Sequence, residues 1–451
     1  MYQRFPTAVC CAFIASISAF AVSNGFCQQA ESPPAPFRVE DQPPADPGPV
    51  PVPRSQESIS SRALSLAQLE QMAENHNPTL AQAARRVEAV QGQQVQVGLY
   101  PNPVVGYQAE EVGDNGRAGQ HGMFFRQEIV TSNKLGLNRA VAAHEVQQAE
   151  WDLQMQRQRI LNDVRSRAYD VLAAQRTMEI AGELVRIGQT AVDVADRLNK
   201  ARETSLVDVI QARVEANSAK LQLSAASKTH SAAWRRLTIV VGIPGMPPCP
   251  LTDSLDEDLP ELSWDETWAA LLGQSPQLAY AYSGVERARW AVARACAGRT
   301  PNIEAGAAIR YNDDSNDTIL SLQVGVPLMV FDRNQGNIMK AHAELAAAQR
   351  EIERIELTLQ DGLAEVFRQY DIAREQVEQY RRDILPYAKQ ALELTRAGYE
   401  QGEFTYLELL TAQQTFSRTN LAYVSRLREL WLATVQIDGM LLSGGLEAPG
   451  R

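Results

Sequence analysis

The chain repeats itself over most of its length, and this repeat constrains the fold more than any other feature of the sequence. Thr204–Ala212 reads TSLVDVIQA and Phe404–Ala412 reads FTYLELLTA, so equivalent residues stand 200 positions apart. Leu64–Ala89 corresponds to Leu262–Ala288 at a spacing of 198 positions. Units this long exclude a solenoid, which is built from many repeats of roughly 20 to 50 residues. The chain therefore consists of two copies of one unit of about 180 residues.

Each copy contains a pattern of period two, which is typical of a β-strand with two different faces. In the second copy, Leu320, Leu322, Val324 and Val326 alternate with Ser321, Gln323 and Gly325. The upstream segment IEAGAAIRY is separated from this strand by the acidic loop NDDSND. The first copy has VVGYQAE and MFFRQEI around EVGDNGRAG, with weaker alternation. We therefore predict one β-hairpin in each copy, with a polar loop at its tip.

The rest of each copy is predicted to be helix of unusual length. The chain has no proline between Pro103 and Pro244, and none between Pro327 and Pro386. A helix of about 60 residues would reach roughly 90 Å. Apolar residues recur at steps of three and four, as expected for a helix buried along one stripe; they are Ile352, Ile355, Leu359, Leu363, Val366, Phe367 and Tyr370. We expect a mainly α fold with β-strands, in which the helices form long hairpins packed like coiled coils.

The repeated phrase has the residues that begin a helix. Ser205-x-x-Asp208 and Thr405-x-x-Glu408 are capping boxes, in which the hydroxyl accepts from an orphan backbone N–H and the acid reaches back. Each box follows a long predicted helix, so the phrase marks the turn of a helical hairpin. Gly402 suits the end of the preceding helix, where a left-handed residue is commonly needed. The first copy has Arg202 at this position, so we expect its turn to differ.

The N-terminal residues are predicted to direct export. Residues 1–21 have the short basic start, the apolar stretch and the Ala19-Phe20-Ala21 site of a signal peptide. Residues 22–63 form a proline-rich tether that can bury little. Cys27 is a candidate for lipidation, although Phe26 precedes it where glycine or alanine is usual. The remaining boundaries are 64–246 for the first copy, 247–261 for a linker, 262–443 for the second copy and 444–451 for a tail.

Composition and residue spacing exclude several classes of function. The net charge of −11 argues against a nucleic-acid binder, which needs a basic stripe. The five histidines show no spacing of metal ligands, and no glycine-rich phosphate loop is present, so we predict no metal site, no cofactor and no enzymatic activity. Cys249 and Cys296 are free to pair or to remain reduced, since two cysteines do not define a disulfide framework.

From Leu64 to about Leu442 the chain resembles the TolC-type outer-membrane efflux proteins. The resemblance rests on the two repeats and on Arg396–Gln413, which reads RAGYEQGEFTYLELLTAQ. It implies a homotrimer in which each chain gives four strands to a single 12-stranded β-barrel in the outer membrane. It also implies a helical tunnel across the periplasm, with the hairpin turns at its tip docking a periplasmic adaptor, or membrane fusion, protein.

A second stretch resembles the heavy-metal branch of the same family, whose members serve proton-driven cation pumps of the inner membrane. This stretch is Val326–Ala348, VPLMVFDRNQGNIMKAHAELAAA. Within it, residues 332–336 are expected to shape the junction between strand and helix rather than to contact cargo. The resemblance thus implies an exit duct that passively conducts substrate from pump and adaptor to the outside.

Physical chemistry independently favours an oligomer. A lone four-stranded sheet cannot span a bilayer with its edges open, because unpaired backbone groups in lipid are too costly. We therefore expect the face of Leu320, Leu322, Val324 and Val326 to meet outer-membrane lipid. The opposite face, with Ser321, Gln323 and Gly325, is expected to line water. The acidic loop, with Asp313, Asp314 and Asp317, is expected to face the outside.

Two alternatives to the efflux duct stay open from the sequence. One is the outer-membrane channel of a protein-secretion system, and the other is a non-conducting periplasmic coiled-coil scaffold. The candidate adaptor-binding tip takes in residues at both predicted turns; these are Arg202, Thr204, Ser205, Asp208, Gly402, Glu403, Thr405 and Glu408. Asp208 and Glu408 are equally well explained as helix caps alone. The sequence leaves the transported substrate and the acids that gate the tunnel unassigned.

Overall fold

The computed structural model describes residues 63–113, 118–257 and 259–447. By its contacts the chain divides into two units, Met1–Ser58 and Ile59–Arg451. The predicted signal peptide, Cys27 and the tether up to residue 62 lie outside the described residues, as do residues 448–451 of the tail. Every described helix and strand belongs to the second unit.

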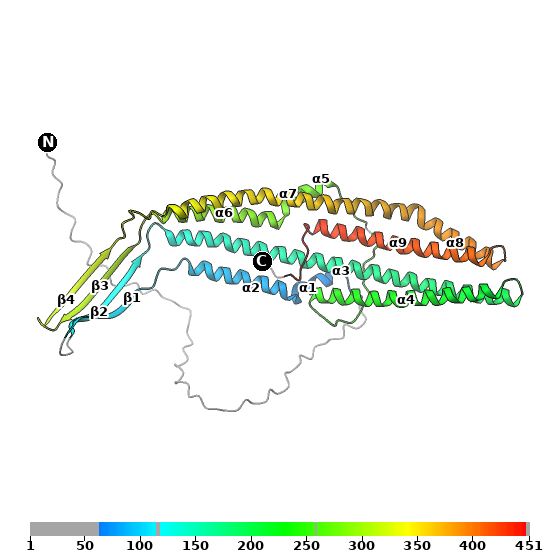
Figure 1. The fold of residues 1–451 in the computed structure, drawn as a ribbon, viewed down its shortest axis with the longest axis horizontal. Helices are drawn as coiled ribbons and strands as arrows, with labels where there is room; N and C mark the ends of the chain where they lie inside the picture. The colour runs from blue at the N-terminus through cyan, green and yellow to red at the C-terminus, as the bar shows by residue number, and fades with distance from the viewer. Residues whose placement is uncertain (1–62, 114–117, 258, 448–451) are drawn as a thin grey trace, which may run out of the picture. The chain divides into compact units, whose positions relative to one another are not determined.

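Four strands form one antiparallel sheet in the order β1-β2-β3-β4 (Figure 1). Their bounds are β1 Val104–Val112, β2 Ala118–Ile129, β3 Ile303–Asn312 and β4 Asp317–Gly325. The two predicted hairpins are therefore confirmed, one in each copy. Pairing of β2 with β3, which sets Phe124 opposite Ala308, joins the two hairpins into a single sheet.

The sheet has one strongly apolar face, as its alternation predicts. Strand register aligns its residues in rows across all four strands; the rows include Val105, Phe125, Ala307 and Leu322, and next to them Tyr107, Met123, Ile309 and Leu320. This face is uncovered within the chain, and the Leu322 side chain is 75% exposed. Gln108, Arg310 and Ser321 belong to the opposite face. Val326 lies one position beyond the end of β4.

The helices occur in the same order in each copy (Figure 1). Before the first hairpin come α1 Leu66–His76 and α2 Pro78–Gln96, and after it α3 Lys134–Lys200 and α4 Leu206–Val241. Around the second hairpin the series is α5 Trp264–Gln274, α6 Pro276–Ala297, α7 Gln335–Gln379, the π-helical turn η2 Tyr380–Ile384, α8 Leu385–Glu400 and α9 Tyr406–Asp438. At 67 residues α3 is the long helix that the absence of proline predicts.

The long helix of the second copy is shorter than expected because it is interrupted. α7 ends after 45 residues and passes into the π-helical turn, and Pro386 follows in the first turn of α8. Proline has no N–H and its ring clashes with the carbonyl four residues earlier, so regular α-helical bonding cannot run through it. A π-helical turn is one way to absorb such a break.

Neighbouring helices continue the arrangement of the sheet. α2, α3, α6 and α7 pack in that order, just as β1, β2, β3 and β4 pair in order. Further from the sheet, α3 packs against α4 and α9, and α8 packs against α9. Over residues 63–113, 118–257 and 259–447, none of the helices combines the length with the apolar composition that a membrane-spanning helix requires.

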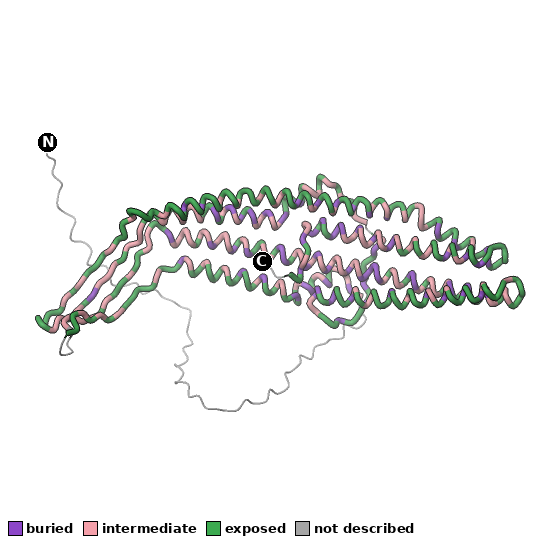
Figure 2. The backbone as a smooth tube through the Cα atoms, viewed as in Figure 1, coloured by how far each residue is buried: buried purple, intermediate pink, exposed green. Residues whose placement is uncertain are grey.

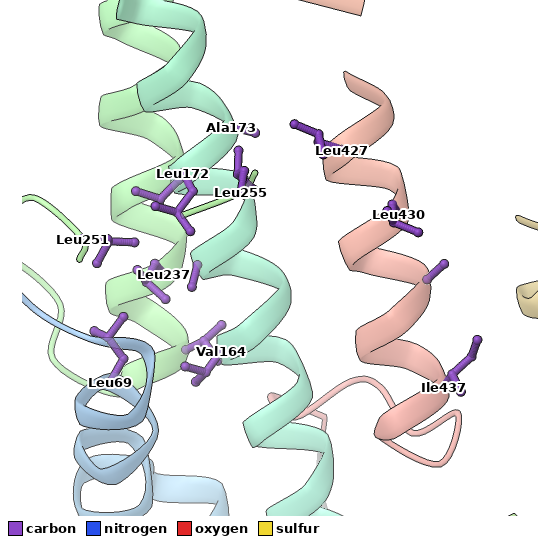
Figure 3. Packing of buried hydrophobic residues seen from close by; sticks show 14 of the residues in the cluster. Leu69, Val164, Leu172, Ala173, Leu237, Leu251, Leu255, Leu427, Leu430 and Ile437 are labelled. Atoms are coloured by element: carbon purple, nitrogen blue, oxygen red, sulfur yellow. The ribbon is translucent and has the colours of Figure 1, made fainter. Parts of the chain in front are cut away.

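Burial is concentrated midway along the helices, where segments of both copies meet (Figure 2). Leu69, Val164, Leu172 and Leu237 of the first copy belong to the same buried cluster as Leu427 and Leu430 of α9 (Figure 3). On α7, Leu359, Leu363, Phe367 and Tyr370 are buried, while Ile352, Ile355 and Val366 pack partly exposed against the cluster. The predicted apolar stripe is therefore confirmed.

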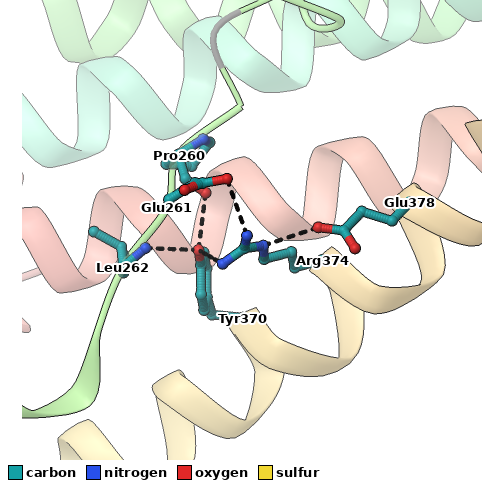
Figure 4. A network of polar contacts seen from close by, with 6 residues as sticks. All are labelled: Pro260, Glu261, Leu262, Tyr370, Arg374 and Glu378. Atoms are coloured by element: carbon teal, nitrogen blue, oxygen red, sulfur yellow. Dashed lines mark hydrogen bonds and ion pairs between the residues drawn. The ribbon is translucent and has the colours of Figure 1, made fainter.

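The segment between the copies is part of this core. Leu251 and Leu255 are buried, and Trp431 Nε1 donates to the Leu255 carbonyl oxygen at 2.9 Å. The Tyr370 hydroxyl donates to the Pro260 carbonyl oxygen at 2.8 Å and accepts from the Leu262 N–H at 2.9 Å (Figure 4). Arg374 Nη2 contacts Glu261 Oε1 at 3.2 Å in the same network. The segment thus ties α7 and α9 together.

The two described cysteines do not pair. Cys249 is buried in the core cluster, whereas Cys296 is exposed near the end of α6, and both are free thiols. The possible disulfide that the sequence left open is absent from the described part of the chain.

Candidate functional site: the two hairpin turns

The residues predicted to form the tip lie at two turns, α3–α4 and α8–α9. Both turns are at the end of the helices remote from the sheet (Figure 1). A second buried cluster holds them together and includes Val209 and Ala212 of α4 with Tyr399, Tyr406 and Leu409 of α8 and α9. The fold therefore brings the two halves of the predicted site to the same end of the molecule.

The α8–α9 turn closes through a left-handed glycine, as predicted. Gly402 has φ +75°, and its N–H donates to the Tyr399 carbonyl oxygen at 3.1 Å. The Glu403 N–H donates to the Gly398 carbonyl oxygen at 2.8 Å. A Cβ at Gly398 would lie 2.2 Å from the Phe404 ring, so this ring packs directly on the glycine. The two bonds satisfy carbonyls that the end of α8 would otherwise leave unpaired.

The α3–α4 turn has the same geometry, so the expectation of a different turn was wrong. Arg202 has φ +63°, and its N–H donates to the Asn199 carbonyl oxygen at 3.0 Å. The Glu203 N–H donates to the Leu198 carbonyl oxygen at 2.9 Å. Satisfying the helix-end carbonyls outweighs the roughly 1–2 kcal/mol that a left-handed conformation costs a residue with a Cβ. Asn199 Nδ2 also donates to the Thr204 carbonyl oxygen at 2.9 Å, which supports the strained turn.

Both capping boxes are confirmed. Ser205 Oγ accepts from the Asp208 N–H at 3.2 Å, and Asp208 Oδ2 accepts in return from the Ser205 N–H at 3.2 Å. Thr405 Oγ1 accepts from the Glu408 N–H at 3.4 Å, and Glu408 Oε2 accepts from the Thr405 N–H at 2.7 Å. Each acid therefore satisfies one of the N–H groups that the start of α4 or α9 leaves free.

These hydrogen bonds hold both carboxylates in their charged form. The Thr204 hydroxyl, which donates to Asp208 Oδ2 at 2.6 Å, is the main cause that lowers the pKa of Asp208. The Thr405 backbone N–H is the main cause that lowers the pKa of Glu408. Because hydrogen bonds to a carboxylate stabilise its anion, each turn keeps one fixed negative charge.

The turns also expose apolar side chains that the sequence reading missed. Val207 and Leu407 occupy equivalent positions two residues after each cap, and both are exposed. Their neighbours Leu206 and Tyr406 differ, since Leu206 is exposed and Tyr406 is buried against Tyr399. The sequence did contain a signal for an exposed apolar residue at each turn. Two apolar residues directly follow each cap, and a single buried stripe needs only one of them.

Further along the helices, toward the sheet, a groove of about 660 Å³ lies between α3, α4 and α9. Polar side chains line much of it, among them Glu215, Gln222, Gln413 and Arg418. The sequence reading did not find this groove, because its residues come from three helices far apart in sequence. Over residues 63–113, 118–257 and 259–447, no cluster of three or more His, Cys, Asp or Glu side chains could hold a metal ion.

The chain is similar to known proteins over both copies. A family model described as outer membrane efflux protein matches residues 69–242 and 269–441. The cobalt-zinc-cadmium resistance protein CzcC of Cupriavidus metallidurans is 27% identical over 370 residues, which cover 82% of this chain and 88% of that protein.

Solved structures share the fold at lower sequence identity. The outer-membrane channel OprN superposes with a TM-score of 0.69 at 18% identity, covering 85% of this chain and 91% of that one. CusC superposes with a TM-score of 0.69 at 17% identity, covering 84% of this chain and 92% of CusC. The outer membrane protein VceC of Vibrio cholerae superposes with a TM-score of 0.67 at 18% identity, covering 84% of this chain and 96% of VceC.

Proposed function

The chain belongs to the outer membrane efflux protein family, and on that basis we propose that it is the exit duct of a tripartite pump for divalent metal cations. The family match spans both copies, and this single observation carries the assignment to outer-membrane efflux. The choice of cargo is supported by the relative CzcC, whose name refers to cobalt, zinc and cadmium resistance. In this role the protein conducts passively, and the energy comes from the inner-membrane pump.

The working form is a homotrimer. Within the described residues, β1 and β4 each pair on one side only, so each chain has two open sheet edges. Open edges in lipid leave backbone N–H and C=O groups without partners, and closure of the sheet removes this cost. Three copies of a four-stranded sheet close into a 12-stranded barrel. The exposed apolar face, with Leu320 and Leu322, then faces the outer-membrane lipid.

The two turns bind the periplasmic adaptor. The proposed contact set is that predicted from the sequence, with the exposed pair Val207 and Leu407 added. Apolar contact surrounded by fixed charges would give both affinity and register to a helical partner. Asp208 and Glu408 serve mainly as helix caps. Their contribution to adaptor binding is the negative charge of their carboxylates.

Gly402→Pro tests the tip in a strain whose metal resistance depends on this protein. Proline fixes φ near −65° and has no N–H, so it can neither adopt φ +75° nor donate to Tyr399. We expect loss of resistance with an intact trimer by native mass. The matched control is Gly402→Ala, which keeps the N–H and should retain most of the resistance. Unchanged resistance in the proline variant would remove the turn from the adaptor contact.

The duct itself is tested by native mass and by single-channel conductance of the purified protein in a planar bilayer. Conducting trimers are expected, and a non-conducting helical rod would favour the scaffold instead. The cargo is tested by deleting the gene and measuring cell-associated cobalt, zinc and cadmium. Accumulation of these cations is expected. Normal cation levels together with loss of an exported protein would favour the secretion channel.

A further inference from the structure

The link after β2 and the link before β3 form a polar junction inside the chain. The Thr131 hydroxyl donates to the Pro301 carbonyl oxygen at 2.7 Å, and the Thr131 N–H donates to Asn302 Oδ1 at 3.3 Å. Lys134 Nζ donates to the Thr300 carbonyl oxygen at 2.6 Å and to Asn302 Oδ1 at 2.5 Å. Where two paired strands end side by side, the segments that continue from them therefore contact each other.

The equivalent links at the two outer edges of the sheet differ in chemistry. Before β1, the residues Leu99 and Tyr100 replace the Arg299 and Thr300 found before β3, while proline and asparagine follow in both copies. After β2 the link spans only residues 130–133, but after β4 it spans 326–334. The longer link reads VPLMVFDRN, so most of its extra residues are apolar.

These apolar side chains have no cover in the chain itself. Phe331 is 90% exposed and Leu328 84%, while Tyr100 is 67% exposed and Leu99 49%. β1 and β4 are the first and last strands of the sheet, so the two links lie at opposite edges. Separate exposed apolar patches at the two opposite edges of one sheet indicate a partner that brings them together.

Closure of the sheet between copies brings them together. All three strand pairs are antiparallel, so β1 and β4 run in opposite directions. When β4 of one copy pairs with β1 of the next, the end of β4 therefore lies beside the start of β1. The link after β4 then meets the link before β1, as the link after β2 meets the link before β3 within the chain.

We propose that residues 326–331 of one copy pack on Leu99 and Tyr100 of the next copy, forming an apolar clasp at each seam of the trimer. The clasp rests on the proposed trimer. The clasp is apolar, whereas the junction within the chain is polar, because the clasp must join separate molecules. Burial of large apolar side chains stabilises such association without a requirement for exact donor and acceptor register.

Photo-cross-linking in the full-length protein tests the clasp. Phe331 is replaced by p-benzoylphenylalanine, the purified trimer is irradiated, and cross-linked peptides are identified by mass spectrometry. We expect a covalent dimer in which the peptide around residue 331 is joined to that around residues 99–100. The matched control carries the same probe at Thr300, the internal equivalent of Tyr100, and should cross-link only within its own chain.

Native mass separates this inference from the proposed function. If the protein is trimeric but the probe at 331 reacts only with lipid, with its own chain or with nothing, the clasp is wrong and the trimer stands. If the protein is monomeric in detergent and in bilayers, both are wrong. A second measurement uses Leu328→Ser with Phe331→Ser, which should lower trimer stability to dissociation by about tenfold or more. The control is Val112→Ser, which lies on the edge strand β1 but at the end remote from Leu99 and Tyr100, and it should have a much smaller effect.

Discussion

Arg202 and Gly402 have the same left-handed backbone conformation at equivalent positions of two helical hairpins, with φ of +63° and +75°. Glycine adopts this conformation freely, whereas arginine is strained in it. The two copies therefore have the same turn at different conformational cost.

Replacing Arg202 by glycine and Gly402 by alanine should change the stability of the two turns in opposite directions. Arg202→Gly relieves strain but increases the entropy of the unfolded chain, so we expect a net stabilisation of about 0.5–1 kcal/mol. Gly402→Ala should destabilise its turn by about 1 kcal/mol. Hydrogen exchange of peptides covering each turn measures both effects. Gly92→Ala is the control, because it lies in helix α2 with open space around it and should stabilise that helix.

Removing the cap hydroxyls should loosen the starts of α4 and α9. Ser205→Ala and Thr405→Ala each delete the acceptor for a backbone N–H, and each should cost about 1 kcal/mol. The same hydrogen-exchange measurement applies, read on peptides that begin at residues 205 and 405. Exchange that speeds up equally in α1, far from both turns, would contradict a local capping effect.

Acid should open the first turn through Asp208. Its pKa is lowered in the folded state, chiefly by the Thr204 hydroxyl, from an ordinary value of 3.8. A lowered folded-state pKa gives stability that is complete above the ordinary value and is lost as pH falls through the folded-state value. We expect pepsin to cleave near Leu206 increasingly as pH falls below 3.8. The Asp208→Asn variant should be cleaved near Leu206 already at the highest pH tested. Its cleavage rate should therefore depend less on pH than that of the unmodified protein.

Removing one hydroxyl should weaken the attachment of the inter-copy segment. Tyr370→Phe leaves the Pro260 carbonyl and the Leu262 N–H without the partner they share, at a cost of about 1–3 kcal/mol. Thermal unfolding and proteolysis between residues 259 and 263 measure the change. Tyr387→Phe is the control, since its ring is exposed and it should be nearly neutral. Equal effects of the two substitutions would show that the network in Figure 4 does not stabilise the fold.

The segment after α9 should detach when its polar anchor is removed. Asn162 Nδ2 donates to the Gly439 and Leu442 carbonyl oxygens at 2.9 and 2.8 Å, in a buried position. Asn162→Ala leaves both carbonyls unpaired, so we expect a loss of about 1–3 kcal/mol. Faster carboxypeptidase release of the C-terminal residues would report it. Asn420→Ala, in which the lost bond is made within one helix, should leave the release rate unchanged.

The sequence predicted those parts of the fold that depend on local pattern. Alternation of Leu320, Leu322 and Val324 gave the apolar sheet face, and the absence of proline gave the long helix α3. The inter-copy segment escaped prediction because Leu251 and Leu255 stand in a proline-rich stretch without periodicity, and their burial depends on distant helices. Pro386 was visible in the sequence, but not that a π-helical turn would precede it.

At the tip, the caps followed from residue types at fixed spacing, so they could be predicted. The conformation of Arg202 could not, because it is set by carbonyls of the preceding helix rather than by the preference of arginine. Two apolar residues after each cap indicated that one would be exposed, but which one depends on the helix face that the second cluster buries, so Val207 and Leu407 could not be singled out. Residue identity therefore predicted the local chemistry of the tip, and packing determined what it exposes.

The π-helical turn at Tyr380–Ile384 makes the two hairpins mechanically unequal. α3 is one continuous rod, whereas the corresponding rod of the second copy changes its hydrogen-bond register partway along and so has a preferred point of bending. In the proposed trimer, stiff and pliant hairpins would alternate around the circumference. Two copies per chain would give that trimer six similar hairpins, and the π-helical turn ahead of Pro386 would divide them into two mechanically different sets of three.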